Sequence, residues 1–333
     1  VIALTALKSD DSIHLHLYED ARDQSLRFKV IHVGAPISLS EALPMLENMG
    51  VRMLAEHVYT LESEGRTLTI HDFELKTKAP LAFDLAHLRD RFERGFEALW
   101  RHEAESDGFN NLVLLAQADW RQVAMLRGYC KYLQQVGIAF SQSYMEETLI
   151  RYPAIAGLLI ELFNAKFDPR RELLSTGELE RAQSDLRREM QALIPADTQK
   201  AKPELIDDIV KTLADKRDQQ IHALWQALKS LLDDVASLDD ERIVLSFMNT
   251  IRATLRTNFF QKWDGPHRHY ISFKFDSKQV PDAPKPVPYR EIFVYSPRVE
   301  GIHLRFGPVA RGGLRWSDRR EDFRTEVLGL VKA

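Results

Sequence analysis

The sequence RFGPVARGGLRWSDRR, residues 305–320, places five arginines and three glycines within sixteen positions. An alternating apolar segment, residues 301–306, leads into this run and predicts a β-strand. Asp318, with Glu321 three residues later, predicts the start of a helix. We therefore interpret the run as a strand-to-helix loop in which Gly312 and Gly313 allow the backbone to approach a ligand closely.

Arg311 and Arg315 give this run planar, permanently charged donors that suit a carboxylate or a phosphate. On composition alone a solvated surface loop fits equally well, because one Gly-Gly pair is a weak motif. Charge favours binding: residues 241–333 carry a net charge of +7, from 17 Lys and Arg and 10 Asp and Glu, whereas residues 1–240 carry −11. The C-terminal part is expected to attract anions.

The same run resembles a known family. Residues 307–319, GPVARGGLRWSDR, are similar to the start of the catalytic domain of the large NAD-specific glutamate dehydrogenases, and the similarity extends through residues 320–333 and back through residues 289–296. In that family a Gly-Gly loop after a strand holds the substrate, with a basic residue just before it. The resemblance implies substrate-binding roles for Arg311, Gly312, Gly313 and Arg315.

Two of these residues leave alternatives open. Arg311 stands where most smaller members of the family have lysine, although arginine is usual in the large class, so which carboxylate of glutamate it would meet is open. Arg315 matches the arginine that follows Gly-Gly-Leu in the family, and pairing with a carboxylate of a helix is its alternative role.

The resemblance implies oxidative deamination of L-glutamate to 2-oxoglutarate and ammonium, with NAD as the cofactor. Hydride would pass from the α-carbon to the nicotinamide, and water activated by a lysine would hydrolyse the iminium. The substrate and catalytic lysines of the family would fall beyond residue 333, and Lys332 does not hold the catalytic position. Because no G-x-G-x-x-G or G-x-x-x-x-G-K motif occurs either, we expect no catalytic residue and no NAD site in this segment, and no activity from it alone.

The composition of the 333 residues, 44% hydrophobic and 28% charged, is typical of a globular protein with two or three domains. No apolar run approaches the ~20 residues of a membrane span. No signal peptide opens the chain, and its first residue, Val1, indicates a segment of a longer protein. The single cysteine, Cys130, excludes an internal disulfide and a thiolate metal site and fits the cytoplasm. No nucleic-acid-binding motif accompanies the basic residues.

Residues 10–80 show the order β-β-α-β-β, which matches part of a ferredoxin-like unit. The order also resembles the ACT-like regulatory modules of the large glutamate dehydrogenases, which implies an amino-acid effector with a site near Gly50; a module that only packs is the alternative. His14, His16 and His32 do not predict a metal site, because no further ligand of the right kind lies near them in sequence.

Residues 81–240 carry apolar stripes at helical spacing. Within them, residues 176–236 are interpreted as a projecting helical hairpin with a solvated stretch at residues 214–220, and we identify no chemistry in it. One more helix is expected at residues 241–260. Strands follow from Tyr270 onwards, interrupted by an extended, proline-rich connection between residues 281 and 288.

The sequence therefore predicts an α+β chain of three parts. Residues 1–80 form an ACT-like module, residues 81–240 a helical region, and residues 241–333 the incomplete start of an α/β substrate-binding catalytic domain. The expected partners are L-glutamate, 2-oxoglutarate and further copies of the chain in a homo-oligomer, with neither nucleic acid nor membrane among them. An amino-acid-binding regulatory module and a helical assembly scaffold are the alternative functions.

Overall fold

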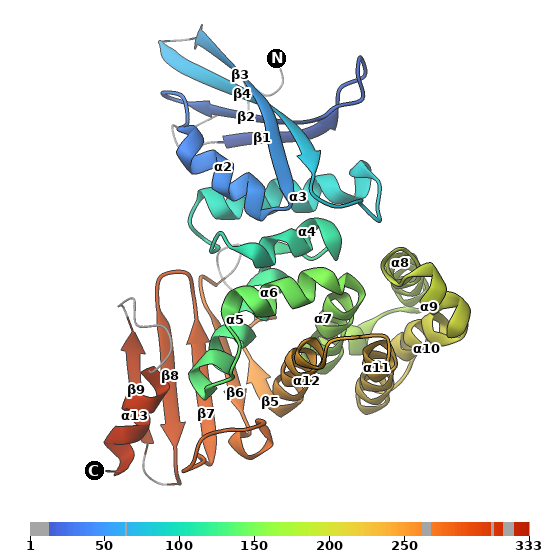
Figure 1. Ribbon diagram of the computed structural model, residues 1–333, viewed down its shortest axis with the longest axis vertical. Helices are drawn as coiled ribbons and strands as arrows, with labels where there is room; N and C mark the ends of the chain where they lie inside the picture. The colour runs from blue at the N-terminus through green and yellow to red at the C-terminus, as the bar shows by residue number, and fades with distance from the viewer. Residues whose placement is uncertain (1–12, 64, 262–267, 308–309, 316–322, 333) are drawn as a thin grey trace. The chain divides into compact units, whose positions relative to one another are not determined.

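The computed structural model describes residues 13–63, 65–261, 268–307, 310–315 and 323–332. The chain forms two compact units, residues 1–123 and 124–333, and the boundary lies within helix α5 (Trp120–Val136). Figure 1 shows the strands and helices of each unit. Both units combine sheet and helix, so the predicted α+β class is confirmed.

The first unit contains the predicted β-β-α-β-β order, followed by a further helix. Its elements are β1 (Ile13–Glu19), β2 (Leu26–Val33), α2 (Leu39–Asn48), β3 (Val51–Ser63), β4 (Arg66–Thr77), α3 (Leu85–Trp100), the 3-10 helix η1 (Gly108–Asn111) and α4 (Leu112–Leu115). The sheet has the order β1-β2-β4-β3, with every neighbouring pair antiparallel. If β1 is counted after α3, the order becomes β-α-β-β-α-β, so this unit is a circular permutation of the ferredoxin-like arrangement.

The core of the first unit follows from the alternation of apolar residues along its strands. Phe28 on β2 is fully buried, and its ring lies 5.2 Å and 4.9 Å from those of Phe92 and Phe96 on α3. Gly50, which ends α2 with a φ of +85°, lies against η1: a Cβ there would be 2.9 Å from Oδ1 of Asn111. Packing inside the unit thus accounts for this glycine without a ligand.

The second unit begins with a helical region. Its helices after α5 are α6 (Gln142–Arg151), α7 (Pro153–Phe167), η2 (Pro169–Leu173), α8 (Thr176–Leu193), α9 (Ala196–Ala201), α10 (Leu205–Lys211), η3 (Thr212–Ala214), α11 (Arg217–Leu232) and α12 (Leu238–Ala253). A five-stranded antiparallel sheet follows, in the order β5-β6-β7-β8-β9. Its strands and remaining helices are β5 (Thr254–Thr257), β6 (Ile271–Phe275), η4 (Ser277–Gln279), β7 (Arg290–Tyr295), β8 (Glu300–Arg305), β9 (Ala310–Arg315) and α13 (Phe323–Lys332).

In the segment predicted as a hairpin, residues 176–236, the return is not one continuous helix. The return is broken into α10, η3 and α11, and α11 packs against α7, while α8 packs against α10 and α7. The break falls at Asp215 and Lys216, and Arg217 anchors it by donating to Glu172 Oε1 at 2.7 Å and to a main-chain oxygen of Asp168 at 3.3 Å. These tertiary contacts compete successfully with continuation of the helix, so the segment is packed on its own unit.

The helix predicted at residues 241–260 ends earlier, at Ala253, and the chain continues directly as β5. Thr254 donates its hydroxyl to the main-chain oxygen of Thr250 at 2.8 Å and lies 2.9 Å from the hydroxyl of Tyr129. Pairing of β5 with β6 supplies the edge of the sheet, and this long-range pairing overrides the helical pattern of the local sequence.

Helix α5 packs very closely on the sheet of the second unit. A Cβ on Gly128 would lie 2.8 Å from Cε2 of Phe273 and 3.5 Å from Cδ1 of Tyr295. A side chain at this position would therefore have to displace aromatic rings of β6 and β7, so a glycine sets how near the helix comes to the sheet.

We expect Gly128→Ala to lower the free energy of unfolding by about 1–3 kcal/mol, because the added methyl group overlaps the Phe273 ring. Urea denaturation followed by circular dichroism measures the change. Gly177→Ala on α8 is the control: nothing lies within 4 Å of its Cβ position, so a helix-stabilising gain of roughly 0.5–1 kcal/mol is expected. A Gly128→Ala variant as stable as the wild type would contradict the packing of α5.

Candidate functional site

The arginine-rich run is a strand where a loop was predicted. Residues 310–315 form β9, which pairs antiparallel with β8, placing Arg311 opposite Leu304 and Gly312 opposite His303. The unpaired edge of β8 supplies backbone partners, which outweigh the weak strand preference of the two glycines. The predicted helix start at Asp318 and Glu321 lies outside the described residues, which resume with α13 at Phe323.

Gly312 has a structural reason to be glycine. A Cβ at this position would lie 3.2 Å from the main-chain oxygen of Ile302 and 3.3 Å from Cδ2 of His303. Gly312 is exposed and Gly313, opposite Ile302, is partly exposed. The strand thus presents bare backbone to solvent beside Arg311, as close approach of a ligand requires.

Arg311 is exposed and weakly engaged. Its Nη1 donates to the main-chain oxygen of Ala310 at 3.3 Å, and within the described residues no carboxylate lies within ion-pair distance of it. Arg315 lies in register with Glu300, four residues further along β9. The backbones of the two arginines are therefore about 13 Å apart.

A buried charged network lies on the sheet face from which Arg311 projects, since Arg311, Leu304 and Glu291 occupy one row across β9, β8 and β7. Glu291 accepts from Nη2 of Arg324 at 3.2 Å and also from its Nε. Both side chains are essentially inaccessible to solvent. The sequence pattern does not reveal this pair, because a single Glu in an alternating strand is equally compatible with a solvated face.

Helix α5 completes the network. The hydroxyl of Tyr132 donates to Oε2 of Glu291 at 3.1 Å, and Oε1 of Gln135 accepts from the backbone N–H of Arg324 at 2.8 Å. The Tyr132 ring stacks on Phe275 with centroids 4.0 Å apart, and burial raises the pKa of its hydroxyl well above the usual value. Glu291 therefore joins β7, α13 and α5 at one point, two strands away from Arg311 on the same face of the sheet.

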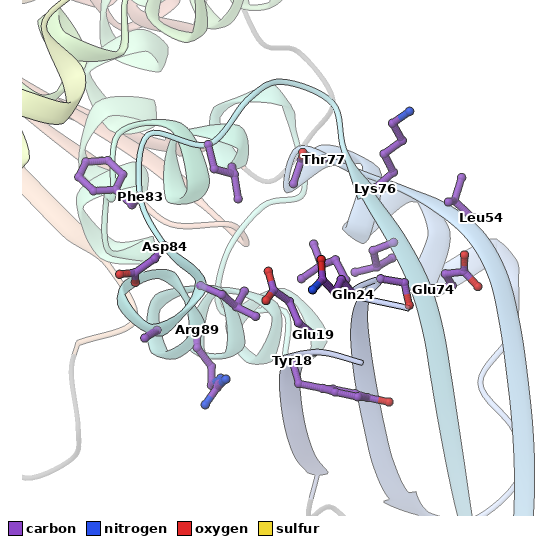
Figure 2. Close-up of a pocket in the computed structure, with 16 residues that line it drawn as sticks. Tyr18, Glu19, Gln24, Leu54, Glu74, Lys76, Thr77, Phe83, Asp84 and Arg89 are labelled. Carbon is purple, nitrogen blue, oxygen red and sulfur yellow. The ribbon is translucent and has the colours of Figure 1, made fainter. Parts of the chain in front are cut away.

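The first unit has a pocket of about 910 Å³ between the end of its sheet and the start of α3. Figure 2 shows Glu19, Gln24 and Glu74 near one another, with Phe83 and Asp84 on the segment that leads into α3. Gln24 has a left-handed backbone, with a φ of +58°, and its N–H donates to the main-chain oxygen of Asp20 at 2.7 Å. Strained backbone at a pocket wall is typical of a functional loop.

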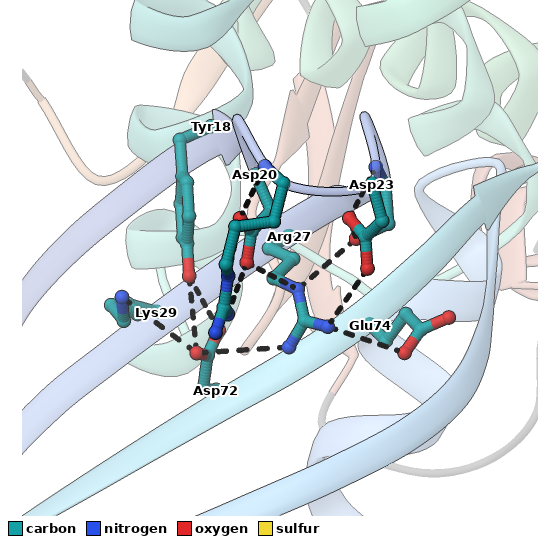
Figure 3. Close-up of polar contacts among 9 residues, drawn as sticks. Tyr18, Asp20, Asp23, Arg27, Lys29, Asp72 and Glu74 are labelled. Carbon is teal, nitrogen blue, oxygen red and sulfur yellow. Dashed lines mark hydrogen bonds and ion pairs between the residues drawn. The ribbon is translucent and has the colours of Figure 1, made fainter.

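A polar cluster holds this wall in place (Figure 3). Arg27, whose side chain is 10% exposed, lies within 3.5 Å of Asp20 and Glu74, 3.7 Å of Asp23 and 3.9 Å of Asp72. Hydrogen bonds from Arg22, aided by the charges of Arg22 and Arg27, hold the pKa of Asp20 well below its usual range. These contacts connect the turn between β1 and β2 to strand β4.

The three histidines considered for a metal do not converge. His14 and His16 share a sheet face with Ile31 and Lys29, whereas His32 projects from the opposite face and stacks on His71 with centroids 5.6 Å apart. Among the described residues no group of three His, Cys, Asp or Glu side chains is arranged to hold a metal ion. No helix in the described part of the chain is both long and apolar enough to cross a bilayer.

Three family models match the chain in succession. Residues 12–88 match the ACT3 domain of glutamate dehydrogenase, residues 104–169 match its helical motif 3, and residues 227–333 match the catalytic domain of bacterial NAD-glutamate dehydrogenase. The resemblance seen in the sequence is confirmed by these matches.

Curated relatives extend the similarity over nearly the whole chain. NAD-specific glutamate dehydrogenase of Halomonas elongata is 40% identical over 97% of this chain, and that of Pseudomonas aeruginosa is 42% identical over 93%. The protein of the same name from Mycobacterium tuberculosis is 38% identical over 100% of the chain. The chain spans 17–18% of the length of these relatives.

We expect Glu291→Gln to lower the free energy of unfolding by about 3 kcal/mol or more, because it leaves the buried Arg324 guanidinium without a counter-charge. Chemical denaturation measures the change, and Glu180→Gln, at an exposed site on α8, is the control. The double variant Glu291→Gln/Arg324→Met should recover part of the loss, since it removes the unpaired charge. A Glu291→Gln variant with wild-type stability would show that the network does not support the unit.

Proposed function

We propose, since the chain corresponds over 93–100% of its length to a segment of the NAD-specific glutamate dehydrogenases, that it is part of an enzyme that oxidatively deaminates L-glutamate with NAD. The segment supplies part of the site for a substrate carboxylate, together with regulation and assembly. The observation that carries this proposal is Arg311, an exposed guanidinium without a carboxylate partner in the described residues, on a strand with bare glycine backbone beside it.

The work of this site is binding. Arg311 can present charge-assisted N–H donors to a carboxylate of glutamate or 2-oxoglutarate, and the exposed backbone at Gly312 lets the ligand lie against β9. The Glu291–Arg324 pair holds α13 and α5 against the same sheet face, which keeps β9 on a rigid support. NAD supplies the hydride acceptor when bound, and we assign it to parts of the enzyme outside this segment.

We propose the functional division of residues 1–80, 81–240 and 241–333 for regulation, assembly and substrate binding. The two compact units meet between Val123 and Ala124, while the family models match residues 12–88, 104–169 and 227–333. An effector-binding first unit is supported by its pocket and by its match to an ACT domain, and assembly into a homo-oligomer is part of the same proposal. The buried thiol of Cys130 is consistent with a place in the cytoplasm.

In the full-length enzyme, we expect Arg311→Ala to raise KM for glutamate ten- to a hundredfold and to leave KM for NAD unchanged. Loss of one charge-assisted contact costs roughly 1.5–3 kcal/mol. Steady-state kinetics with each substrate varied in turn measures the two constants. Arg305→Ala is the control, because Arg305 is exposed on β8 beside the Leu304 row. Arg311→Lys should keep much of the affinity, and an unchanged KM for glutamate in Arg311→Ala would remove Arg311 from the site.

Residues 1–333 alone are expected to form no NADH from glutamate and NAD, because the segment shows no dinucleotide motif and no catalytic lysine at the family position. Absorbance at the NADH band, with the full-length enzyme as the positive control, measures this. Formation of NADH by the purified segment would refute the division of roles between this segment and the rest of the enzyme.

A further inference from the structure

The second unit also has a pocket, of about 440 Å³, at the place where α5 ends. Three segments form it: the end of α5 with the turn that follows, the middle of α12, and residues 281–282 after η4. Since α12 packs against η4, elements of this one unit hold the pocket together. A pocket of this size with a mainly apolar lining is typical of a small-molecule site. The apolar residues of the lining are Leu133, Val136, Ile138, Phe140, Leu245 and Pro281.

The neutral polar side chains on the lining offer acceptors. Ser246 and Asn249 lie three residues apart on α12 and therefore share one face of the helix. Ser246 donates its hydroxyl to the main-chain oxygen of Arg242 at 2.7 Å, and Nδ2 of Asn249 donates to that of Leu245 at 2.8 Å. Because both side chains already donate to their own helix, the hydroxyl oxygen and the amide oxygen are left to accept from a ligand.

The end of α5 adds a preference for positive charge. The N–H of Gly137 donates to the main-chain oxygens of Leu133 and Gln134, and the N–H of Ile138 donates to that of Leu133. In the described part of the chain neither bond reaches the main-chain oxygen of Val136. The last turn of this 17-residue helix carries no basic residue, so its own sequence does not compensate the negative end of the helix dipole.

Among the described residues, two charged side chains line the pocket, and one of them is already engaged. Arg242 lies 3.5 Å from Asp239, and its guanidinium lies over the ring of Phe140, 5.5 Å from the centroid. Asp282 makes no hydrogen bond or ion pair with another residue in the described part of the chain. Its backbone is left-handed, with a φ of +53°, a costly conformation that is typical of functional loops. The lining therefore carries one carboxylate that has no partner in the protein.

We propose that this pocket binds a small organic ammonium ion with an apolar body. Asp282 accepts from the ammonium group, Ser246 and Asn249 supply neutral acceptors, and the body lies against the apolar side chains of α5 and α12. A ligand with a carboxylate in place of the ammonium group would meet Asp282 and the negative end of α5, so the pocket should reject it.

The pocket shares helix α5 with the buried charged network. Leu133 and Val136 line the pocket, and the residues just before them, Tyr132 and Gln135, make hydrogen bonds in that network. A ligand in the pocket therefore contacts the same turn of α5 that supports the sheet of β9.

Isothermal titration calorimetry of residues 1–333 near neutral pH tests the proposal, with 2-phenylethylammonium as the probe. We expect saturable binding at one site. The analogue 2-phenylethanol keeps the apolar body without the charge, and methylammonium keeps the charge without the body. Each should bind at least about tenfold more weakly, because one of the two contributions is lost. The anion 3-phenylpropanoate should give no saturable heat, since its charge has the wrong sign.

Asp282→Asn should weaken binding of 2-phenylethylammonium about tenfold or more, because the charge-assisted contact is lost. Asparagine also adopts the left-handed backbone, so the thermal unfolding of this variant should match the wild type. Asn249→Leu, which removes one neutral acceptor, should weaken binding about threefold or more. Asp218→Asn is the control, because this exposed residue lies outside the pocket lining.

The proposal is overturned if 2-phenylethylammonium gives no saturable heat, if 2-phenylethanol or 3-phenylpropanoate binds as tightly, or if Asp282→Asn binds the probe as the wild type does. These outcomes do not depend on Arg311 or on turnover, so they leave the dehydrogenase proposal to its own kinetic test.

Discussion

Glu291 and Arg324 face each other in a part of the second unit that water does not reach. Removing two such ions from water costs roughly several kcal/mol for each ion, and the cost is offset only when geometry and further hydrogen bonds are good. The fork of Arg324 on both carboxylate oxygens, with the hydroxyl of Tyr132 on one of them, supplies such hydrogen bonds, while Nη1 of Arg324 is buried without a partner in the described part of the chain. Since the partners come from β7, α13 and α5, the pair satisfies its charges only when all three elements are in place.

Close packing of α5 on the sheet supports the same arrangement. Because Gly128 has no side chain, α5 lies close to β6. At this distance Tyr132 contacts both Phe275 and Glu291. Helix α5, which belongs to the predicted middle region, therefore packs directly on the sheet that carries Arg311. This contact joins residues far apart in the chain, so the local sequence pattern does not reveal it.

The local sequence pattern is sufficient to predict an element where it matches the burial of that element. The alternation in residues 13–33 predicts two strands correctly, because one face of each strand is buried. Local pattern fails where pairing with a distant segment determines the structure. Helix α12 ends before Thr254, because the chain from Thr254 onwards pairs with β6 as an edge strand. The candidate site also has one part that the local sequence reveals and one part that it does not. Arg311 stands in a recognisable local run, whereas the Glu291–Arg324 pair joins residues 33 positions apart and carries no motif. The pocket of the first unit is likewise assembled from several distant segments, so no single stretch predicts it.

The two parts of the chain carry net charges of opposite sign. Residues 241–333, with a net charge of +7, attract anions, whereas residues 1–240 carry −11, and the pocket of the first unit is lined by three carboxylates together with Lys76 and Arg89. By charge alone, an anionic ligand is therefore drawn to the part of the chain that carries Arg311 rather than to the acidic part.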